Sequence, residues 1–324
     1  TFANDPERGL FILIFLFSLI FISLFIFFFF HKPNQSNLNN FFWLSKETSI
    51  IINNWFMMYF LSVVLVGTVY PIFLDVLTSE KISVGPPFYH KLIIPFLIPF
   101  LLMMAIGPKL KWIKSNLEDK VYLISLLFIS FLLSFLIVKN FNSNFLINTI
   151  LISSALYLFF VTLRDFFIKK KNNISQNIAH FGFSLLILSI LFNSLFSTEI
   201  ITNLKVGETF ENSTTKIIFK NINQKNEKNY KSVVGNFSIQ NSNGKIDNLS
   251  PELRIYNQPN IVTSEADIKT TLLSDKFLVI NLVQNQDYFN VRYQVKPFML
   301  WIWLSVLLIS LGALISLFKK EYEK

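Results

Sequence analysis

Seven long apolar segments, separated by short polar stretches, are the feature that most restricts how this chain can fold. Most of them reach the roughly 18–20 residues that a helix needs to cross a hydrocarbon core of about 30 Å. Charged residues make up only 15% of the chain, against roughly 25% in a soluble domain. We therefore predict a polytopic α-helical membrane protein with about seven spans. The segments are residues 9–30, 51–76, 92–107, 121–138, 145–163, 178–196 and 298–318.

The third apolar segment is the shortest and carries Pro95 and Pro99. Proline removes a backbone donor, so we expect a kinked helix whose freed carbonyls are satisfied by neighbouring helices. A re-entrant segment that does not cross the bilayer is the alternative for this stretch.

Basic residues are concentrated in four polar regions, which fall on one side of the membrane if the seven spans alternate. The positive-inside rule makes that side cytoplasmic. Thr1 and residues 197–297 then lie outside. The net charge of +9 follows from this asymmetry, so we expect no nucleic-acid partner. The basic residues are His31, Lys32 and Lys46; Lys109, Lys111, Lys114 and Lys120; Arg164, Lys169, Lys170 and Lys171; and Lys319, Lys320 and Lys324.

Residues 197–297 change in character and predict a small, mainly β, outward-facing domain inserted before the last span. Between Phe289 and Val295 apolar and polar residues alternate, as in a half-buried strand, and residues 216–222, 231–240 and 276–283 do so too. Asn243-Gly244 and Val206-Gly207 are turn candidates, and we expect a mobile loop at 221–229. The predicted organisation is a membrane domain at 1–196 with six spans, the β-rich domain at 197–297, and the last span with a cytoplasmic tail at 298–324.

The chain offers little conventional catalytic chemistry. It has no cysteine, which excludes disulfides, thiolate metal sites and cysteine nucleophiles within it. Common hydrolase, P-loop and zinc-protease motifs are absent. We interpret Arg164-Asp165 as an interfacial ion pair and expect Asp75 and Glu80 to be solvated. No catalytic residue is assigned.

His180 is the candidate site residue. It lies inside the sixth span, several ångströms below the cytoplasmic headgroups, where an ionisable side chain is costly and usually functional. Neutral imidazole is a good axial ligand for haem iron, and the small residues Ala179 and Gly182 would let a flat macrocycle or another helix approach. A histidine that only bonds a neighbouring helix is the equal alternative. His31 and His90 are most simply interfacial histidines.

Five segments resemble the CcmF family of cytochrome c maturation proteins, in the same order and with the same topology. The matches run from the first residues to the last span. They are Phe2-Ala3-Asn4-Asp5-Pro6-Glu7-Arg8-Gly9; Gly67-Thr68-Val69-Tyr70-Pro71; Ile82-Ser83-Val84-Gly85-Pro86-Pro87-Phe88-Tyr89; Ser250-Pro251-Glu252-Leu253-Arg254-Ile255-Tyr256 with Ser264-Glu265-Ala266-Asp267-Ile268; and Val295-Lys296-Pro297-Phe298-Met299-Leu300-Trp301-Ile302-Trp303-Leu304.

The resemblance implies a component of a haem lyase that helps transfer haem to apocytochrome c. It implies a haem b held inside the membrane, with His180 as an axial ligand of its iron and quinol as the electron donor. The implied partners are a periplasmic haem chaperone, apocytochrome c with its thiol-handling partner, and the lipid bilayer. The implied location is the bacterial inner membrane with the β domain in the periplasm, or alternatively the mitochondrial inner membrane.

The chain departs from the family pattern by matching only its C-terminal half. The family's tryptophan-rich haem-binding loop and its other intramembrane haem ligand would lie upstream of Thr1. The segment Asp5-Pro6-Glu7-Arg8 has no signal-peptide layout, so we expect a chain that works with its upstream half. The second axial ligand is left open, with His31 as a less favoured candidate.

Two functions remain open. The chain is part of a redox-active haem lyase, or it is a non-catalytic scaffold that docks the haem chaperone and apocytochrome through its outer domain. Within the outer domain we expect Glu252, Arg254, Glu265 and Asp267 to shape the domain or its contacts rather than do chemistry. A secondary transporter is disfavoured, because the sequence has no inverted repeat and no mid-membrane carboxylate.

Overall fold

The computed structural model describes residues 6–30, 42–78, 82–114, 119–141, 144–168, 174–241, 244–258, 261–283 and 287–318. Within these residues the chain forms seven long helices and ten strands. It divides into two compact units, Thr1–Ile168 and Lys169–Lys324, and each is described by itself. The predicted membrane domain at 1–196 contributes helices to both units.

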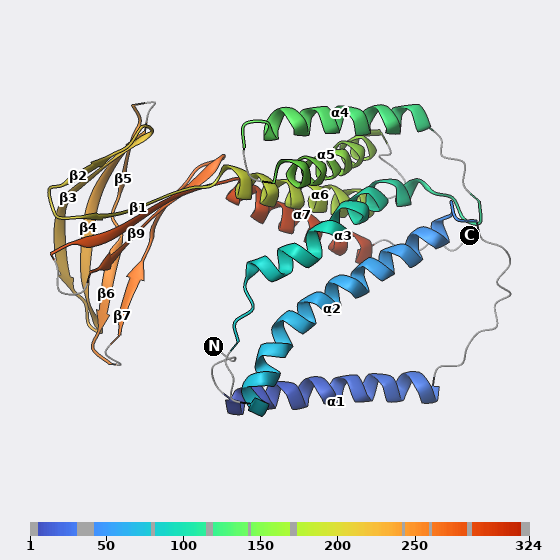
Figure 1. Ribbon diagram of the computed structural model, residues 1–324, viewed down its shortest axis with the longest axis horizontal. Helices are drawn as coiled ribbons and strands as arrows, with labels where there is room; N and C mark the ends of the chain where they lie inside the picture. The colour runs from blue at the N-terminus through green and yellow to red at the C-terminus, as the bar shows by residue number, and fades with distance from the viewer. Residues whose placement is uncertain are drawn as a thin grey trace. The chain divides into compact units, whose positions relative to one another are not determined.

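The first unit contains five of the long apolar helices (Figure 1). Helix α5 packs against both α3 and α4 and buries more of its side chains than any other described helix. Its middle carries the small residues Ser153, Ser154 and Ala155, all buried, which let its neighbours approach closely. The helices are α1 Pro6–Phe30, α2 Lys46–Thr78, α3 Pro86–Ile106 with a short 3₁₀ turn at Gly107–Lys109, α4 Lys120–Val138 and α5 Phe145–Ile168.

Helix α3 is continuous through Pro95 and Pro99. Its 21 residues are long enough to span about 30 Å, which favours a full span over the re-entrant alternative. Tyr59 on α2 donates a hydrogen bond of 2.9 Å to the carbonyl of Leu92, three residues before Pro95. A neighbouring helix therefore contacts the backbone close to Pro95, although the carbonyl that Pro95 leaves without its helical donor is that of Lys91.

The structure corrects the expectation that Asp75 is solvated. Only 6% of the residue is exposed, and α2 continues past it to Thr78, so Asp75 lies in the last turn of the helix and not at its solvated end. Glu80 lies outside the described residues.

The second unit consists of α6 Ile174–Phe196, α7 Met299–Phe318 and a β domain inserted between them (Figure 1). Both sheets of this domain are antiparallel. One has the strand order β1-β10-β9-β8, and the other has the order β2-β3-β4-β6-β7, with β5 paired to β4. The strands are β1 Thr198–Leu204, β2 Thr209–Glu211, β3 Thr215–Asn226, β4 Tyr230–Asn241, β5 Ile246–Leu249, β6 Glu252–Tyr256, β7 Val262–Glu265, β8 Asp267–Thr270, β9 Ser274–Leu282 and β10 Phe289–Pro297.

A single hydrophobic core lies between the two sheets. On β10, Val291 and Tyr293 are fully buried while Arg292 between them is exposed, which is the predicted alternation. From the other sheet, the rings of Phe219 and Phe237 stack with their centroids 4.2 Å apart. The chain is therefore a polytopic helical membrane protein with a small β domain before its last helix, as predicted.

The turn predictions can be compared at the two glycines. Gly207 and Gly244 both adopt positive φ, at 88° and 72°, a conformation that glycine adopts without strain; Asn243 lies outside the described residues. The predicted loop at 221–229 is wrong over its first part. Strand β3 continues to Asn226 and pairs with β4 up to Lys231, because backbone pairing does not require buried side chains on either face.

Candidate functional site

His180 is the seventh residue of α6, about 9 Å along the axis from the helix start at 1.5 Å per residue. Its side chain is partly buried. The helix places it among apolar residues within a candidate membrane span.

Helices α6 and α7 pack against each other (Figure 1), and their contact is close near His180. A Cβ atom added to Gly312 would lie 2.8 Å from both the carbonyl oxygen of Ser175 and the amide nitrogen of Ala179. A Cβ atom added to Gly182 would lie 3.0 Å from the backbone nitrogen of Ile309. The two backbones are therefore almost in contact, which is typical of small-residue helix packing in membranes.

This contact decides what the small residues near His180 do. Ala179 and Gly182 admit another helix, α7, and not a macrocycle, on their face of α6. His180 follows Ala179 by one residue, which rotates it by about 100° around the helix. It therefore lies off the stripe that packs on α7, on the same side as Ser184, which is fully buried and donates a 2.8 Å hydrogen bond to the Phe181 carbonyl.

The remaining histidines do not join His180 in a described cluster. His90 is exposed in the first turn of α3, and His31 lies outside the described residues. Among the residues that the structure describes, no group of three His, Asp or Glu side chains is placed to hold a metal ion. A porphyrin supplies four of the ligands of its iron, so a single imidazole such as that of His180 would be compatible with haem.

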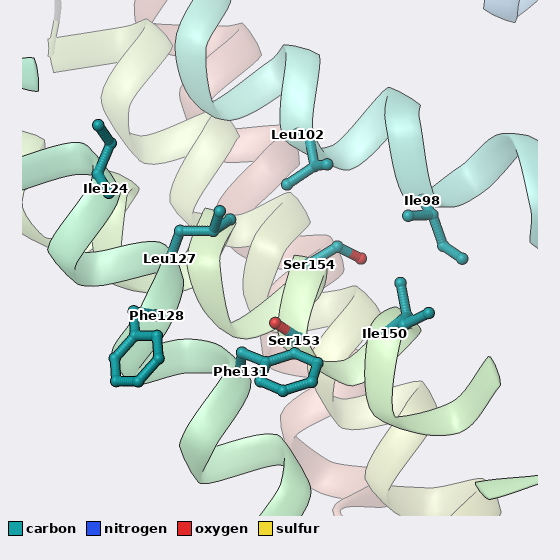
Figure 2. A pocket seen from close by; sticks show the side chains of 9 residues that line it. All are labelled: Ile98, Leu102, Ile124, Leu127, Phe128, Phe131, Ile150, Ser153 and Ser154. Atoms are coloured by element: carbon teal, nitrogen blue, oxygen red, sulfur yellow. The ribbon is translucent and has the colours of Figure 1, made fainter. Parts of the chain in front are cut away.

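An apolar cavity of about 410 Å³ lies within the first unit, between α3, α4 and α5 (Figure 2). Seven apolar side chains line it, and the only polar side chains on its wall are Ser153 and Ser154 of α5. Ser154 donates its hydroxyl to the Leu151 carbonyl at 2.8 Å. The apolar lining residues are Ile98, Leu102, Ile124, Leu127, Phe128, Phe131 and Ile150. The sequence carried no signal for this cavity, because its lining reads as ordinary lipid-facing helix.

Two ion pairs lie at the same end of the first unit's helices. The Lys109 ammonium contacts both carboxylate oxygens of Asp165, at 2.8 and 2.7 Å, and Arg164 contacts Asp119 at 3.1 Å. The predicted Arg164–Asp165 pair is thus replaced by two pairs with other elements, because consecutive helical residues point in different directions.

The β domain encloses an ion cluster that the sequence did not predict. The Asp247 carboxylate, 1% exposed, contacts Lys269 at 2.7 Å and also contacts Lys276. Burial opposes the charge of Asp247, but hydrogen bonds and the positive charges of the two lysines outweigh it and lower the pKa of Asp247. The same carboxylate and, above all, burial raise the pKa of Tyr293 to about 12.

The four charged residues singled out in the outer domain are bonded within that domain. Glu252 accepts hydrogen bonds from Ser232 and Arg254, and these interactions lower the pKa of Glu252. Asp267 accepts a 2.6 Å hydrogen bond from the Ser250 amide, and Glu265 accepts one from Thr263. These contacts lie within the domain and fit a structural role.

Comparison with known proteins finds relatives that match this chain along its length. Residues 195–297 match the family described as the CcmF C-terminal beta-sandwich. The cytochrome c-type biogenesis protein CcmF of Pseudomonas fluorescens is 28% identical over 340 residues, covering 100% of this chain and 51% of the relative. CcmF of Escherichia coli K12 is 27% identical over 333 residues, covering 100% of this chain and 51% of the relative. The chain thus spans about half the length of the curated relatives it matches.

The fold is also similar to a solved structure, that of a cytochrome c haem lyase CcmF. The TM-score is 0.66 with 20% sequence identity, and the match covers 84% of this chain and 46% of that chain. This likeness concerns the fold.

Proposed function

We propose that this chain, which matches the CcmF C-terminal beta-sandwich over residues 195–297 and about half the length of CcmF relatives, is the part of a cytochrome c haem lyase that holds an intramembrane haem b and carries the outward β domain. The observation that carries the proposal is the position of His180, inside a membrane helix and on a face that α7 does not cover. The family resemblance supports the same residue.

In this proposal His180 is an axial ligand of the iron of haem b. When bound, haem b supplies a one-electron redox centre. The chain contributes an imidazole in an apolar span, and imidazole nitrogen is a common ligand of haem iron. The tight contact of Gly312 with Ala179 fixes helix α6 beside the ligand, so the imidazole is held on a rigid element. The second axial ligand comes from the upstream half.

We further propose that quinol is the electron donor and that the cavity between α3, α4 and α5 admits it. An isoprenoid tail matches the apolar walls, and the hydroxyls of Ser153 and Ser154 suit a polar ring. A photoreactive quinone analogue tests this. Labelling of α3–α5 peptides that is lost in Phe128→Trp, which fills the cavity, is expected; labelling elsewhere would remove the cavity from the proposal.

The proposed setting is the bacterial inner membrane, a location that bacterial relatives support, with the β domain in the periplasm; the mitochondrial inner membrane is the alternative. The proposed partners are the upstream half, a haem chaperone, apocytochrome c and its thiol-handling partner. The concentration of basic residues in loops on one side of the spans supports this orientation.

The deciding experiment replaces His180 by Ala in the complete assembly, with His90→Ala as the matched control, since His90 is exposed at the end of a span. Loss of the low-spin haem b absorbance and of cytochrome c yield is expected only for His180→Ala. Unchanged haem content and unchanged yield in that variant would overturn the proposal.

A docking scaffold is the second candidate function. The β domain favours it, because its core is closed between its own two sheets and it presents a well-defined surface for partners. Deleting residues 198–297 from the assembled protein should abolish co-purification of the haem chaperone and apocytochrome. Retained binding would exclude this function for the domain.

A further inference from the structure

The connection between β8 and β9 exposes two leucines to its surroundings. Leu272 is 72% exposed and Leu273 is 67% exposed. The connection is tight, since Thr271 donates to the Ser274 carbonyl through its amide at 3.0 Å and through its hydroxyl at 2.7 Å. Tight hairpin loops favour Gly, Asn and Asp. Neither turn geometry nor core packing accounts for two adjacent leucines at this tip.

The tip is tied to the start of the last membrane helix. The Phe298 amide donates to the Leu273 carbonyl at 2.8 Å, and the indole nitrogen of Trp301 donates to the Leu272 carbonyl at 2.9 Å. Helix α7 begins at Met299, so Trp301 is only its third residue. The two leucines therefore lie within one helical turn of the point where the chain enters the membrane.

The tryptophan sets the level of the tip relative to the bilayer. Indole rings at the ends of spans sit at the level of the headgroups, with the ring in apolar surroundings and the N–H bonded to a polar group. Here the polar group is the carbonyl of the tip itself. Trp303 lies two residues further along this predominantly apolar helix. It is 64% exposed, as expected of a ring that faces lipid.

We propose that Leu272 and Leu273 insert into the membrane leaflet on the side of the β domain and hold the near end of that domain on the lipid surface. Their exposed side chains are apolar, and the hydrogen bonds of Phe298 and Trp301 fix the backbone that carries them at headgroup level. This role needs neither bound haem nor a partner protein, so it is independent of the proposed function.

The absence of cysteine in the chain allows a direct test with single-cysteine probes. Leu272→Cys and, separately, Leu273→Cys are labelled with an environment-sensitive fluorophore in the full chain and reconstituted into lipid nanodiscs. Val206→Cys is the matched control, because Val206 is also an exposed apolar residue, at 47%. It follows β1, whose seven residues carry the chain about 20 Å away from α6.

Blue-shifted emission and quenching by lipids that carry a nitroxide near the headgroup are expected at positions 272 and 273 but not at 206. Emission at 272 and 273 that matches position 206, without lipid quenching, overturns the proposal. So does a probe that stays in water until the haem chaperone or apocytochrome is added, because the leucines would then be a protein docking site. Two label positions guard against a local distortion caused by one substitution.

Discussion

The Asp247 carboxylate on β5 lies 2.7 Å from the Lys269 ammonium on β8, so one ion pair joins the two sheets of the β domain. Lys276 contacts the same carboxylate and is the direct cross-strand partner of Lys269. Like charges in that position repel each other. The single buried carboxylate between them holds this end of the sandwich together.

Asp247→Asn should therefore destabilise the β domain by about 3 kcal/mol, since breaking a buried pair leaves an uncompensated charge. Hydrogen exchange measured by mass spectrometry should accelerate in β5, β8 and β9. The matched control is Glu211→Gln, which breaks the exposed pair with Lys216 and should change exchange little. Equal effects of the two substitutions would contradict the structural role of the cluster.

The lowered pKa of Asp247 also predicts an acid dependence. A carboxylate whose pKa is lower in the folded state contributes stability above its ordinary value of about 3.8, and that contribution disappears as the pH falls through the folded-state value. The β domain should lose protection from pepsin as the pH falls below about 4. Asp247→Asn should flatten this dependence, and an unchanged slope would argue against it.

Tyr293 predicts the opposite pH limit. Burial, and then the charge of Asp247, raise its pKa from 10.0 to about 12. The tyrosine of the unfolded chain therefore ionises before that of the folded chain, and the β domain should lose stability as the pH rises from about 10 to about 12. Tyrosinate absorbance should include a late step, near pH 12, that is missing in Tyr293→Phe. Asp247→Asn should move that step to lower pH. The phenylalanine variant should be as stable as the parent at neutral pH, because the Tyr293 hydroxyl has no hydrogen-bond partner within the described chain.

Gly312→Ala tests the contact that supports His180. The added methyl group would lie 2.8 Å from backbone atoms of Ser175 and Ala179, which cannot move aside as a side chain can. A cost of about 1–3 kcal/mol, a lower thermal midpoint in detergent and a reduced haem b content are expected. Gly85→Ala is the control, since its methyl group would lie 3.6 Å from the nearest atom, in Pro87. Normal haem content in Gly312→Ala would show that the packing does not position the ligand.

The sequence predicted the features that depend on local pattern. The lengths of the apolar segments predicted the spans, and the alternation around Val291 and Tyr293 predicted a core strand. Both patterns can be recognised because they lie in consecutive residues. The Ala179 and Gly182 pair was recognised as a place of close approach. Which body approaches could not be deduced, because a glycine admits a helix and a macrocycle equally well.

The features that sequence reasoning missed depend on partners far apart in the chain. Asp247 and Lys276 are 29 residues apart, and their meeting follows from how two sheets stack. The tip at Leu272 carries no turn signal, since leucine is typical of helices and buried cores. The hydrogen bonds from Phe298 and Trp301 reveal that the tip lies beside a membrane helix.

The two ion pairs at the ends of α3, α4 and α5 differ in how much of their side chains water can reach. Lys109 and Asp165 keep only 13% and 16% of their side chains exposed, whereas Arg164 and Asp119 keep 31% and 58%. Removing one charge from a shielded pair leaves the other charge less well compensated, although its remaining exposure to water reduces the penalty. Asp165→Asn should therefore lower the free energy of unfolding by about 2 kcal/mol. Asp119→Asn should cost little, because water replaces the lost partner. Thermal midpoints of both variants in the same detergent decide the matter, and a larger loss for Asp119→Asn would contradict the pairing.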